Sequence, residues 1–363
     1  MMNKTFPNIF IFVLAVFILV YFFNNNILSQ TKEEKEKARK LIERGMDYMS
    51  QEDVVTALHC FNEAVDLDPD VTDYNYKLAM AYFGYGSILK AYDIVEELLD
   101  KKDCKDIYYE LAGNCQNLLG YRSDAEKLYK AGLKKFPNSG CLYLELGISE
   151  FGNEKYEEAL KYLEKGIEAE PNFPANYYWT SLALFNTDNE LWCILYGEAF
   201  MNLEKNTKKS QFISKILYRA YRHCIFPMPD STHGIYFSSK KKNDNFTFGS
   251  LFEQTIAITE VKLEDSLDVK EMSALRTDFI KKWYAAGFDK KYPNVIFDFH
   301  KELISKGYFE CYNYWLLRKG EPVTFQDWLP TYRSKFYEFT NWFLDNSLTF
   351  ENGHSLLRKN YLE

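Results

Sequence analysis

Histidine and cysteine are the side chains from which a catalytic or metal site in this chain would be built. The five histidines are scattered along the sequence: His59, His223, His233, His300 and His354. His223 has a cysteine next to it, Cys224. A Cys/His dyad requires the two side chains to meet in space, which adjacency in the sequence does not arrange. We interpret this pair as a His at a loop edge beside a buried Cys.

The acidic residues add no recognisable chemistry. Asp298 and His300 lie two positions apart on an expected helix, so their side chains point in different directions. The sequence holds no H-E-x-x-H, no phosphate-binding P-loop and no G-x-G-x-x-G that opens a helix. We therefore predict no catalytic residues, no metal ligands and no cofactor.

The seven cysteines form no framework. No two of them make a C-x-x-C pair, and the count is odd. This usage predicts mostly buried free thiols that act as small apolar side chains, although one disulfide or one reactive thiol stays open.

Composition narrows the class of partner. The 363 residues are enough for two or three domains, and the formal net charge is −8. Because no basic stripe stands out, the charge argues against nucleic acid as the partner.

The elements that would position these residues follow one spacing, 34 residues. Small or special residues recur at that interval in three sets: Gly45, Ala79, Gly113 and Gly147; Ala57, Ala91, Ala125 and Ala159; Pro69, Pro137 and Pro171, with Asp103 at the skipped place. A 34-residue period is typical of helix–turn–helix repeats. The sequence therefore predicts an array of paired helices.

The glycines indicate close packing within each pair. A Gly inside a helix costs about 1 kcal/mol relative to Ala, so it usually has a packing reason. We expect Gly147 to face the partner helix near Ala159. A leucine there would overpack the pair, whereas we expect alanine to be mild or stabilising.

The fourth copy carries the clearest motif: Tyr143, Leu146-Gly147, Ala159 twelve residues on, and Pro171 twelve further. This pattern resembles the tetratricopeptide repeat (TPR) family. The resemblance implies an all-α solenoid of about five helix pairs over residues 30–205. The repeats lie near 38–71, 72–105, 106–139 and 140–173, with a degenerate copy at 174–205.

In TPR arrays the first helix of each pair lines an inner groove. By that resemblance the partner-binding groove comprises Met46, Met49, Tyr76, Met80, Phe83, Asn114, Asn117, Ile148 and Phe151. The family's carboxylate-clamp members hold a peptide C-terminus with Lys, Arg and Asn, and here only the two Asn look similar. The Met and aromatic content favours an apolar helix or extended peptide. Alternatively, neighbouring helices or this chain's own C-terminal domain cover these side chains.

Residues 1–29 resemble a targeting segment. Lys4 precedes an apolar run at 9–23, and Ser29 offers a small residue before a cut that would leave Gln30 first. The alternative is an uncleaved membrane anchor at 6–23. The lysines that follow the run would then favour a cytoplasmic chain by the positive-inside rule, although they alternate with glutamates.

Residues 206–363 form the second predicted domain, an irregular helical one of no recognised family. We expect helices near 249–263, 268–286, 293–306, 308–318 and 325–345, and a short strand within 234–238. Its many aromatic residues should mostly be core, since exposing them would cause aggregation.

Two hypotheses of function follow. The first is a non-enzymatic protein-interaction scaffold of the bacterial cell envelope, exported to the periplasm or membrane-anchored, with a protein or peptide partner. Membrane contact would then come only through an uncleaved N-terminal segment. The alternative is an enzyme whose site lies in the C-terminal domain, with the repeats presenting substrate. Convergence of His223, His233 and His300 with carboxylates in one pocket would favour the enzyme.

Overall fold

The computed structural model describes residues 31–187, 189–227, 233–237, 247–261, 267–350 and 356–361. The predicted signal peptide or anchor at 1–29 lies outside these residues. Within them, no helix combines the length and the apolar character needed to cross a membrane.

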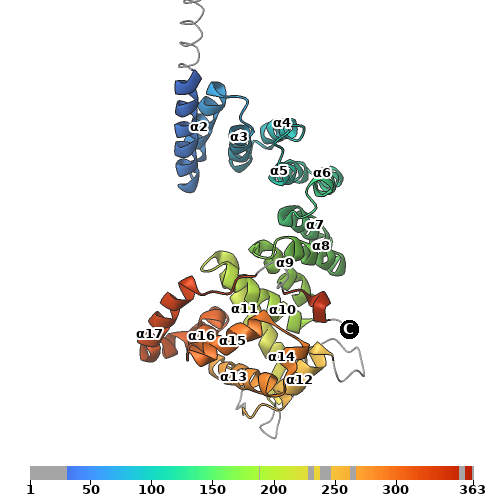
Figure 1. The fold of residues 1–363 in the computed structure, drawn as a ribbon, viewed down its shortest axis with the longest axis vertical. Coiled ribbons are helices and arrows are strands. Elements are labelled where there is room, and N and C mark those ends of the chain that lie inside the picture. The colour runs from blue at the N-terminus through green and yellow to red at the C-terminus, as the bar shows by residue number, and fades with distance from the viewer. Residues whose placement is uncertain are drawn as a thin grey trace, which may run out of the picture. The chain divides into compact units, whose positions relative to one another are not determined.

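The described chain is all-α apart from one two-stranded sheet, and it divides into two compact units after Gly132. The first unit holds a helix over residues 31–50 and then α2 (Val54–Leu67), α3 (Thr72–Tyr85), α4 (Ile88–Leu98), α5 (Asp106–Leu118) and most of α6 (Arg122–Lys135). These helices follow one another as pairs (Figure 1). The predicted domain boundary near residue 205 stays a prediction.

The second unit continues the pairs and then departs from them. Its paired helices are α7 (Gly140–Gly152) with α8 (Tyr156–Ala169), and α9 (Pro174–Phe185) with α10 (Glu190–Leu203). After these come α11 (Lys208–Cys224), β1 (Ile225–Pro227), β2 (His233–Ile235), α12 (Phe248–Ala257), α13 (Val269–Ala285), α14 (Phe288–Lys291), α15 (Val295–Ser305), α16 (Phe309–Leu317), α17 (Pro322–Asp345) and a 3₁₀ turn, η1 (Arg358–Tyr361). The five predicted C-terminal helices are therefore present, four of them within three residues of their expected bounds, whereas α12 ends at Ala257, six residues before its expected end.

One contact explains the repeated small residue. In three pairs, a Cβ added to the glycine of the first helix would collide with a large side chain sixteen residues later. For Gly147 the added atom would lie 2.6 Å from Leu163 Cδ2 and 3.5 Å from the backbone oxygen of Ala159. The second pair has alanine and a smaller partner, both fully buried. The combinations are Gly45 with Phe61, Ala79 with Val95, Gly113 with Tyr129, and Gly147 with Leu163.

In the fifth pair both residues of this contact are small, and the glycine lies on the second helix. Ser181 stands at the first-helix position, and Gly197 lies sixteen residues later. A Cβ at Gly197 would lie 2.8 Å from Ser181 Oγ and 2.9 Å from Leu217 Cδ2 on α11. The copy that looks degenerate in sequence therefore keeps the close approach, with the glycine moved to its second helix.

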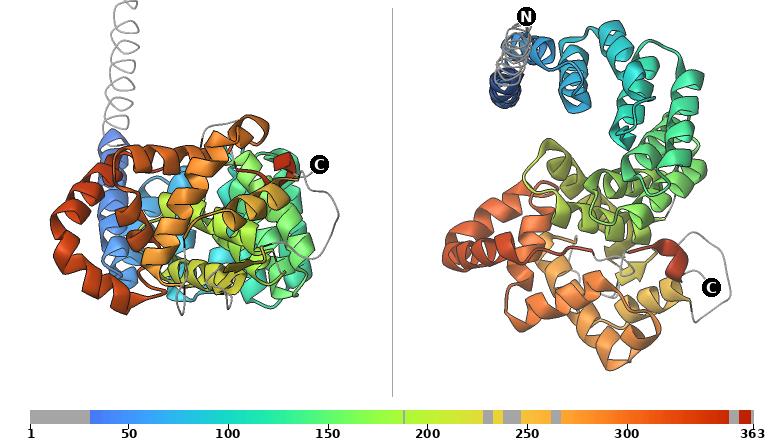
Figure 2. Two further views of the ribbon diagram at one scale, coloured as in Figure 1. Left: turned by 90° about the horizontal axis from the view of Figure 1, so that it is seen from below. Right: turned by 45° about the horizontal axis from the view of Figure 1, so that its top comes forward.

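The second unit has a large hydrophobic core and a smaller cluster beside it, around Leu144, Ala159 and Leu163. The larger core is the one that extends into the C-terminal helices. It runs from Leu160 and Ile167 on α8, through all of α10, to the aromatic side chains of α12 to α17 and Tyr361. Helix α10 is buried on every side over Glu190–Asn202 because α9, α11 and the later helices surround it. Figure 2 shows the orange C-terminal helices gathered beside these central helices. As predicted, most of the aromatic residues there belong to the core or pack against it, although Tyr332 and Tyr337 are exposed.

The last described residues run back over the fourth and fifth pairs (Figure 1). The Phe350 amide donates to Asn172 Oδ1 at 2.8 Å, and Asn172 Nδ2 donates to the Phe350 carbonyl at 2.6 Å. The Phe350 ring stacks on Tyr177 with centroids 5.1 Å apart. Farther on, Arg358 Nε pairs with Glu164 at 3.0 Å. The tail is therefore part of the second unit's packing.

Replacing Gly147 by alanine tests the contact that separates paired helices. Because Leu163 is fully buried, the new methyl group should cost about 1–3 kcal/mol, which corrects the expectation that alanine would be mild. Adding Leu163→Val reproduces the Ala79/Val95 combination and should recover much of the loss. Urea unfolding followed by tryptophan fluorescence measures the free energy of unfolding of the second unit, since all six Trp lie beyond residue 132. If the costs of Gly147→Ala and Leu163→Val simply add in the double variant, the contact between the two residues does not cause the loss of stability.

Candidate functional site

Side chains from successive first helices lie together in the first unit. The methyl carbon of Met49 comes within 4.0 Å of a Cβ placed on Gly84 of α3. The Tyr76 ring of α3 lies 5.0 Å from the ring of Tyr108 on α5. Met46 and Met80 are 47% and 44% exposed, and Phe83 is half-buried. We call Met46, Met49, Tyr76, Met80 and Phe83 the first-helix surface.

The two predicted polar residues of this surface differ in their roles. The Asn114 side-chain oxygen accepts a 2.6 Å hydrogen bond from the Tyr129 hydroxyl, and the ring of Tyr129 packs on Gly113. Asn117, one turn later on α5, is exposed. Asn114 therefore helps to hold its own helix pair together, and Asn117 alone of the two is placed for a partner.

Ile148 and Phe151 belong to the second unit, on α7. Phe151 packs edge-on against Trp179 of α9 with centroids 5.1 Å apart, and against Tyr156 of α8 at 5.3 Å. Ile148 is half-buried beside the cluster of Leu144, Ala159 and Leu163. Both side chains are thus partly used in packing neighbouring helices, as the alternative interpretation of the groove expects.

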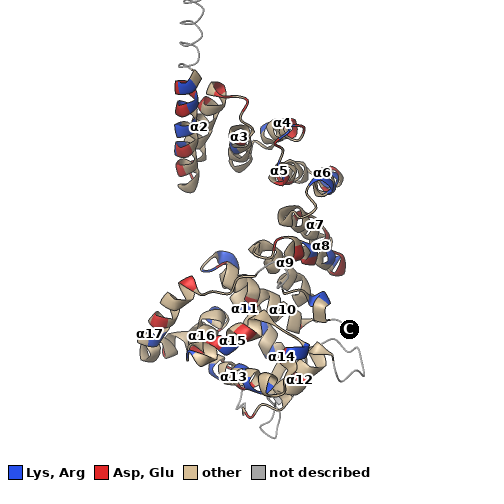
Figure 3. Cartoon of the chain, in the orientation of Figure 1, with Lys and Arg blue, Asp and Glu red and all other residues tan. Residues whose placement is uncertain are grey.

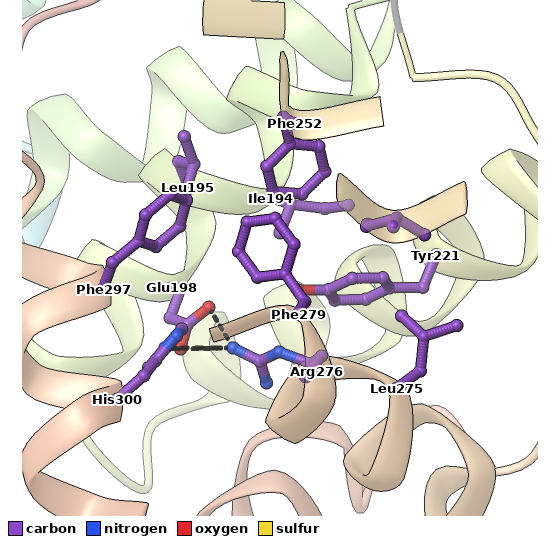
Figure 4. A pocket seen from close by; sticks show the side chains of 11 residues that line it. Ile194, Leu195, Glu198, Tyr221, Phe252, Leu275, Arg276, Phe279, Phe297 and His300 are labelled. Carbon is purple, nitrogen blue, oxygen red and sulfur yellow. Dashed lines mark hydrogen bonds and ion pairs between the residues drawn. The ribbon is translucent and has the colours of Figure 1, made fainter. Parts of the chain in front are cut away.

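A buried polar cluster lies inside the second unit (Figure 4). Arg276 on α13 donates from Nη2 to both carboxylate oxygens of Glu198 on α10, at 2.8 and 2.7 Å. His300 Nε2 on α15 lies 2.5 Å from Glu198 Oε1. Arg276 also donates to Asn313 Oδ1 on α16. Four helices that are distant in the sequence are joined by these bonds.

The charges in this cluster balance. Burial alone would raise the pKa of Glu198, but the charge of Arg276 and the hydrogen bonds from His300 and Arg276 lower it to about 2, so the carboxylate stays ionised. Burial lowers the pKa of His300, although Glu198 opposes this, so the ring is neutral near pH 7 and donates from Nε2. The result is a compensated ion pair with a neutral donor beside it.

The space around this cluster excludes a substrate. The cavity that Glu198, Arg276 and His300 share with Phe252, Phe279 and their neighbours measures about 20 Å³, room for about one water molecule. Aromatic rings of the core fill the surrounding space (Figure 4). The cluster therefore fastens helices together, and catalysis on a substrate does not fit it.

His223 and His300, whose side chains are described, do not converge. His223 Nδ1 lies 2.8 Å from Glu190 Oε1, while His300 contacts Glu198. These two glutamates are eight residues apart on α10, which is about 12 Å along a helix. The side chain of His233 and all of His354 lie outside the described residues. Asp298 binds the Tyr284 hydroxyl instead of sharing a site with His300.

Sequence reasoning missed Glu198, Arg276 and Asn313. A usable signal existed for Glu198, which is a charged residue in the middle of an otherwise apolar helix, Glu190–Leu203. A charge at such a position needs a buried partner. Nothing local identifies Arg276 as that partner, because it lies 78 residues later. The thiols agree with expectation, since all seven cysteines are free and only Cys104 is more than slightly exposed.

No protein-family model matches the chain, and no curated protein matches it. Several solved structures are similar in fold. TTC0263, a TPR protein of Thermus thermophilus, is 14% identical, with a TM-score of 0.45 over 50% of this chain and 98% of that one. PilF of Pseudomonas aeruginosa is 15% identical, with a TM-score of 0.44 over 53% and 86%. PilW, a type IV pilus biogenesis factor, is 16% identical, with a TM-score of 0.42 over 51% and 84%. The chain is thus similar to TPR proteins over about half its length, and these low scores carry no conclusion about function.

The buried pair predicts a specific pattern of stability. Arg276→Met leaves the Glu198 charge buried without its partner and should cost about 3–5 kcal/mol. The double variant Glu198→Leu with Arg276→Met removes both charges. It should therefore lose clearly less unfolding free energy than Arg276→Met alone. Urea unfolding of the second unit, read by tryptophan fluorescence, compares them. A double variant as unstable as the sum of both singles would contradict the pairing.

Proposed function

We propose that the protein is a non-enzymatic scaffold whose N-terminal helix pairs bind an apolar helical or extended segment of another protein. The observation that carries this proposal is the exposure of Met46 and Met80 on successive first helices, next to half-buried Met49, Tyr76 and Phe83. Large apolar side chains that stay exposed together commonly mark an interaction surface. Methionine and aromatic residues suit such binding because they adapt to varied partners.

The charge pattern of α3 supports the same surface. Figure 3 shows few charged side chains on α3, α7 and α9, whereas α6, α8 and the helix over residues 31–50 carry many. On α3 the two charges satisfy each other, since Lys77 lies 3.0 Å from Asp73. A partner segment that contacts α3 would therefore meet a pair of charges that already satisfy each other. An apolar segment fits this surface better than an acidic or basic one.

One observation argues against placing an enzyme's active site at the Glu198 cluster. The best-enclosed polar cluster, around Glu198, has a cavity of only about 20 Å³. A substrate needs a pocket of several hundred cubic ångströms. The Glu198 cluster therefore gives the enzyme alternative no support.

Peptide binding tests the scaffold. Peptides selected from a random phage-displayed library against the full chain should be rich in apolar residues. Met80→Ala combined with Phe83→Ala should weaken binding of the best peptide by at least about 30-fold, since one truncated anchor costs about 2 kcal/mol. Fluorescence anisotropy gives the Kd. The melting temperature should change little because Met80 is 44% exposed.

A matched control uses apolar residues on second helices. Val55 of α2 and Leu89 of α4 are both 63% exposed. Val55→Ala combined with Leu89→Ala should leave the peptide affinity within about twofold of the original, since such contacts lie away from the anchors. Equal losses in the two double variants, or a selection that yields only polar peptides, would refute the first-helix surface as the binding site.

The proposal also places the protein at the bacterial cell envelope, on the strength of the apolar run at 9–23 and the small Ser29 after it. N-terminal sequencing of the protein from fractionated cells should find Gln30 first in the exported fraction. An intact Met1 or Met2 in the membrane fraction would favour the anchor, and a chain with an intact N-terminus in the soluble cytoplasm would overturn both.

A further inference from the structure

We propose that Glu190, His223 and Cys224 form a binding site for a zinc ion. One ligand atom from each, a carboxylate oxygen, an imidazole nitrogen and a thiol sulfur, lies within 4.8 Å of the other two. The site is separate from the first-helix surface and from the Glu198 cluster, and neither of their roles uses it.

Two helix ends bring the three side chains together. Glu190 is the first residue of α10, and His223 and Cys224 are the last two of α11. Cys224 is fully buried and continues directly into β1, while the His223 side chain is 66% exposed. The site therefore has a buried base and an open side through which an ion can enter.

The burial of Glu190 gives a second reason, beside the distances, to expect a bound cation here. It is a carboxylate only 4% exposed. Its Oε1 has the 2.8 Å contact with His223, but its Oε2 is buried and has no hydrogen-bond partner among the described residues. A buried carboxylate oxygen without a partner carries an uncompensated desolvation cost. The His223 hydrogen bond accounts for one oxygen only, and a divalent cation would satisfy both the charge and the second oxygen.

The mixture of donors selects the metal. Magnesium and calcium take oxygen ligands, whereas one oxygen, one nitrogen and one sulfur suit zinc. Zinc would hold its ligand atoms roughly 3.5 Å apart, given bonds of about 2.0–2.3 Å. The His223 nitrogen and the Glu190 oxygen, now 2.8 Å apart, would separate slightly by rotation of the exposed histidine.

Three protein ligands leave a fourth position on the zinc. Glu190 and His223 also line a pocket of about 490 Å³ together with Tyr218, Arg219 and Arg222. Zinc with three protein ligands and an accessible fourth position normally carries water or a small ligand. The two arginines make that ligand an anion, such as a carboxylate, rather than a cation.

Cobalt substitution tests the site directly. The full chain is stripped with a chelator and titrated with Co²⁺, which takes zinc sites and gives a near-ultraviolet charge-transfer band when a thiolate binds it. We expect one Co²⁺ per chain, the thiolate band, and displacement of both by one equivalent of Zn²⁺. Cys224→Ser should abolish the band, and the control Cys104→Ser, at the most exposed other thiol, should keep it.

Two further variants should keep the fold, so that a loss of metal binding cannot be attributed to misfolding. His223→Ala changes an exposed side chain, so circular dichroism should be unchanged, and Glu190→Gln keeps the shape of the carboxylate. Each should raise the Kd for Zn²⁺ by at least about 100-fold, the upper range for losing a supporting contact to a metal site. The site is overturned if the original chain binds no Co²⁺, if Cys224→Ser keeps the band, or if both further variants bind as tightly as the original. Peptide binding at the first-helix surface should be unaffected in all of these variants, so the two proposals fail separately.

Discussion

The contact between two residues sixteen positions apart controls how closely the helices of each pair approach. A glycine or another small residue on one helix accepts a bulky side chain of the other against its backbone, as Gly147 accepts Leu163. Because protein interiors are packed like crystals, an added methyl group has no free space to occupy. The contact is indifferent to which helix supplies the small residue, and the Ser181 and Gly197 combination uses the opposite choice. What is retained through the array is at least one small residue at this point of each pair.

The fifth pair links this array to the helices that follow. Its second helix, α10, is covered by α11 at Gly197 and by Arg276 and His300 at Glu198. A charged residue at the centre of such a helix would be destabilising alone, and it is tolerated because a guanidinium and an imidazole meet it. The same residues tie α10 to α13 and α15. Packing and charge pairing thus act on one helix and make the end of the array part of a larger core.

Much of the fold was predictable from the sequence. Regular spacing predicted the helix pairs, and helical periodicity placed α13 at 268–286 against the observed Val269–Ala285. The pairings that depend on tertiary structure were not predictable. The sequence gives no local sign that Arg276 meets Glu198, or that Cys224 lies near Glu190, since each pair comes from two different helices. The hydroxyl partner of Asn114, Tyr129, was also hidden, since its spacing of fifteen is meaningful only once two helices fold back on each other. Site residues were therefore predictable by position on a helix, but not by the partner that each one has.

The tail described above has a consequence for the order of folding during synthesis. Phe350, Leu357 and Tyr361 are core residues of the second unit, and Tyr361 donates to the carbonyl of Pro293, which precedes α15. These residues are synthesised after the helices that they cover. The first unit, whose contacts are local in sequence, can complete its packing while translation continues. The second unit must wait with part of its aromatic interior uncovered until residues 350–361 have been synthesised. In the cell, its dependence on chaperones should therefore be concentrated in that interval.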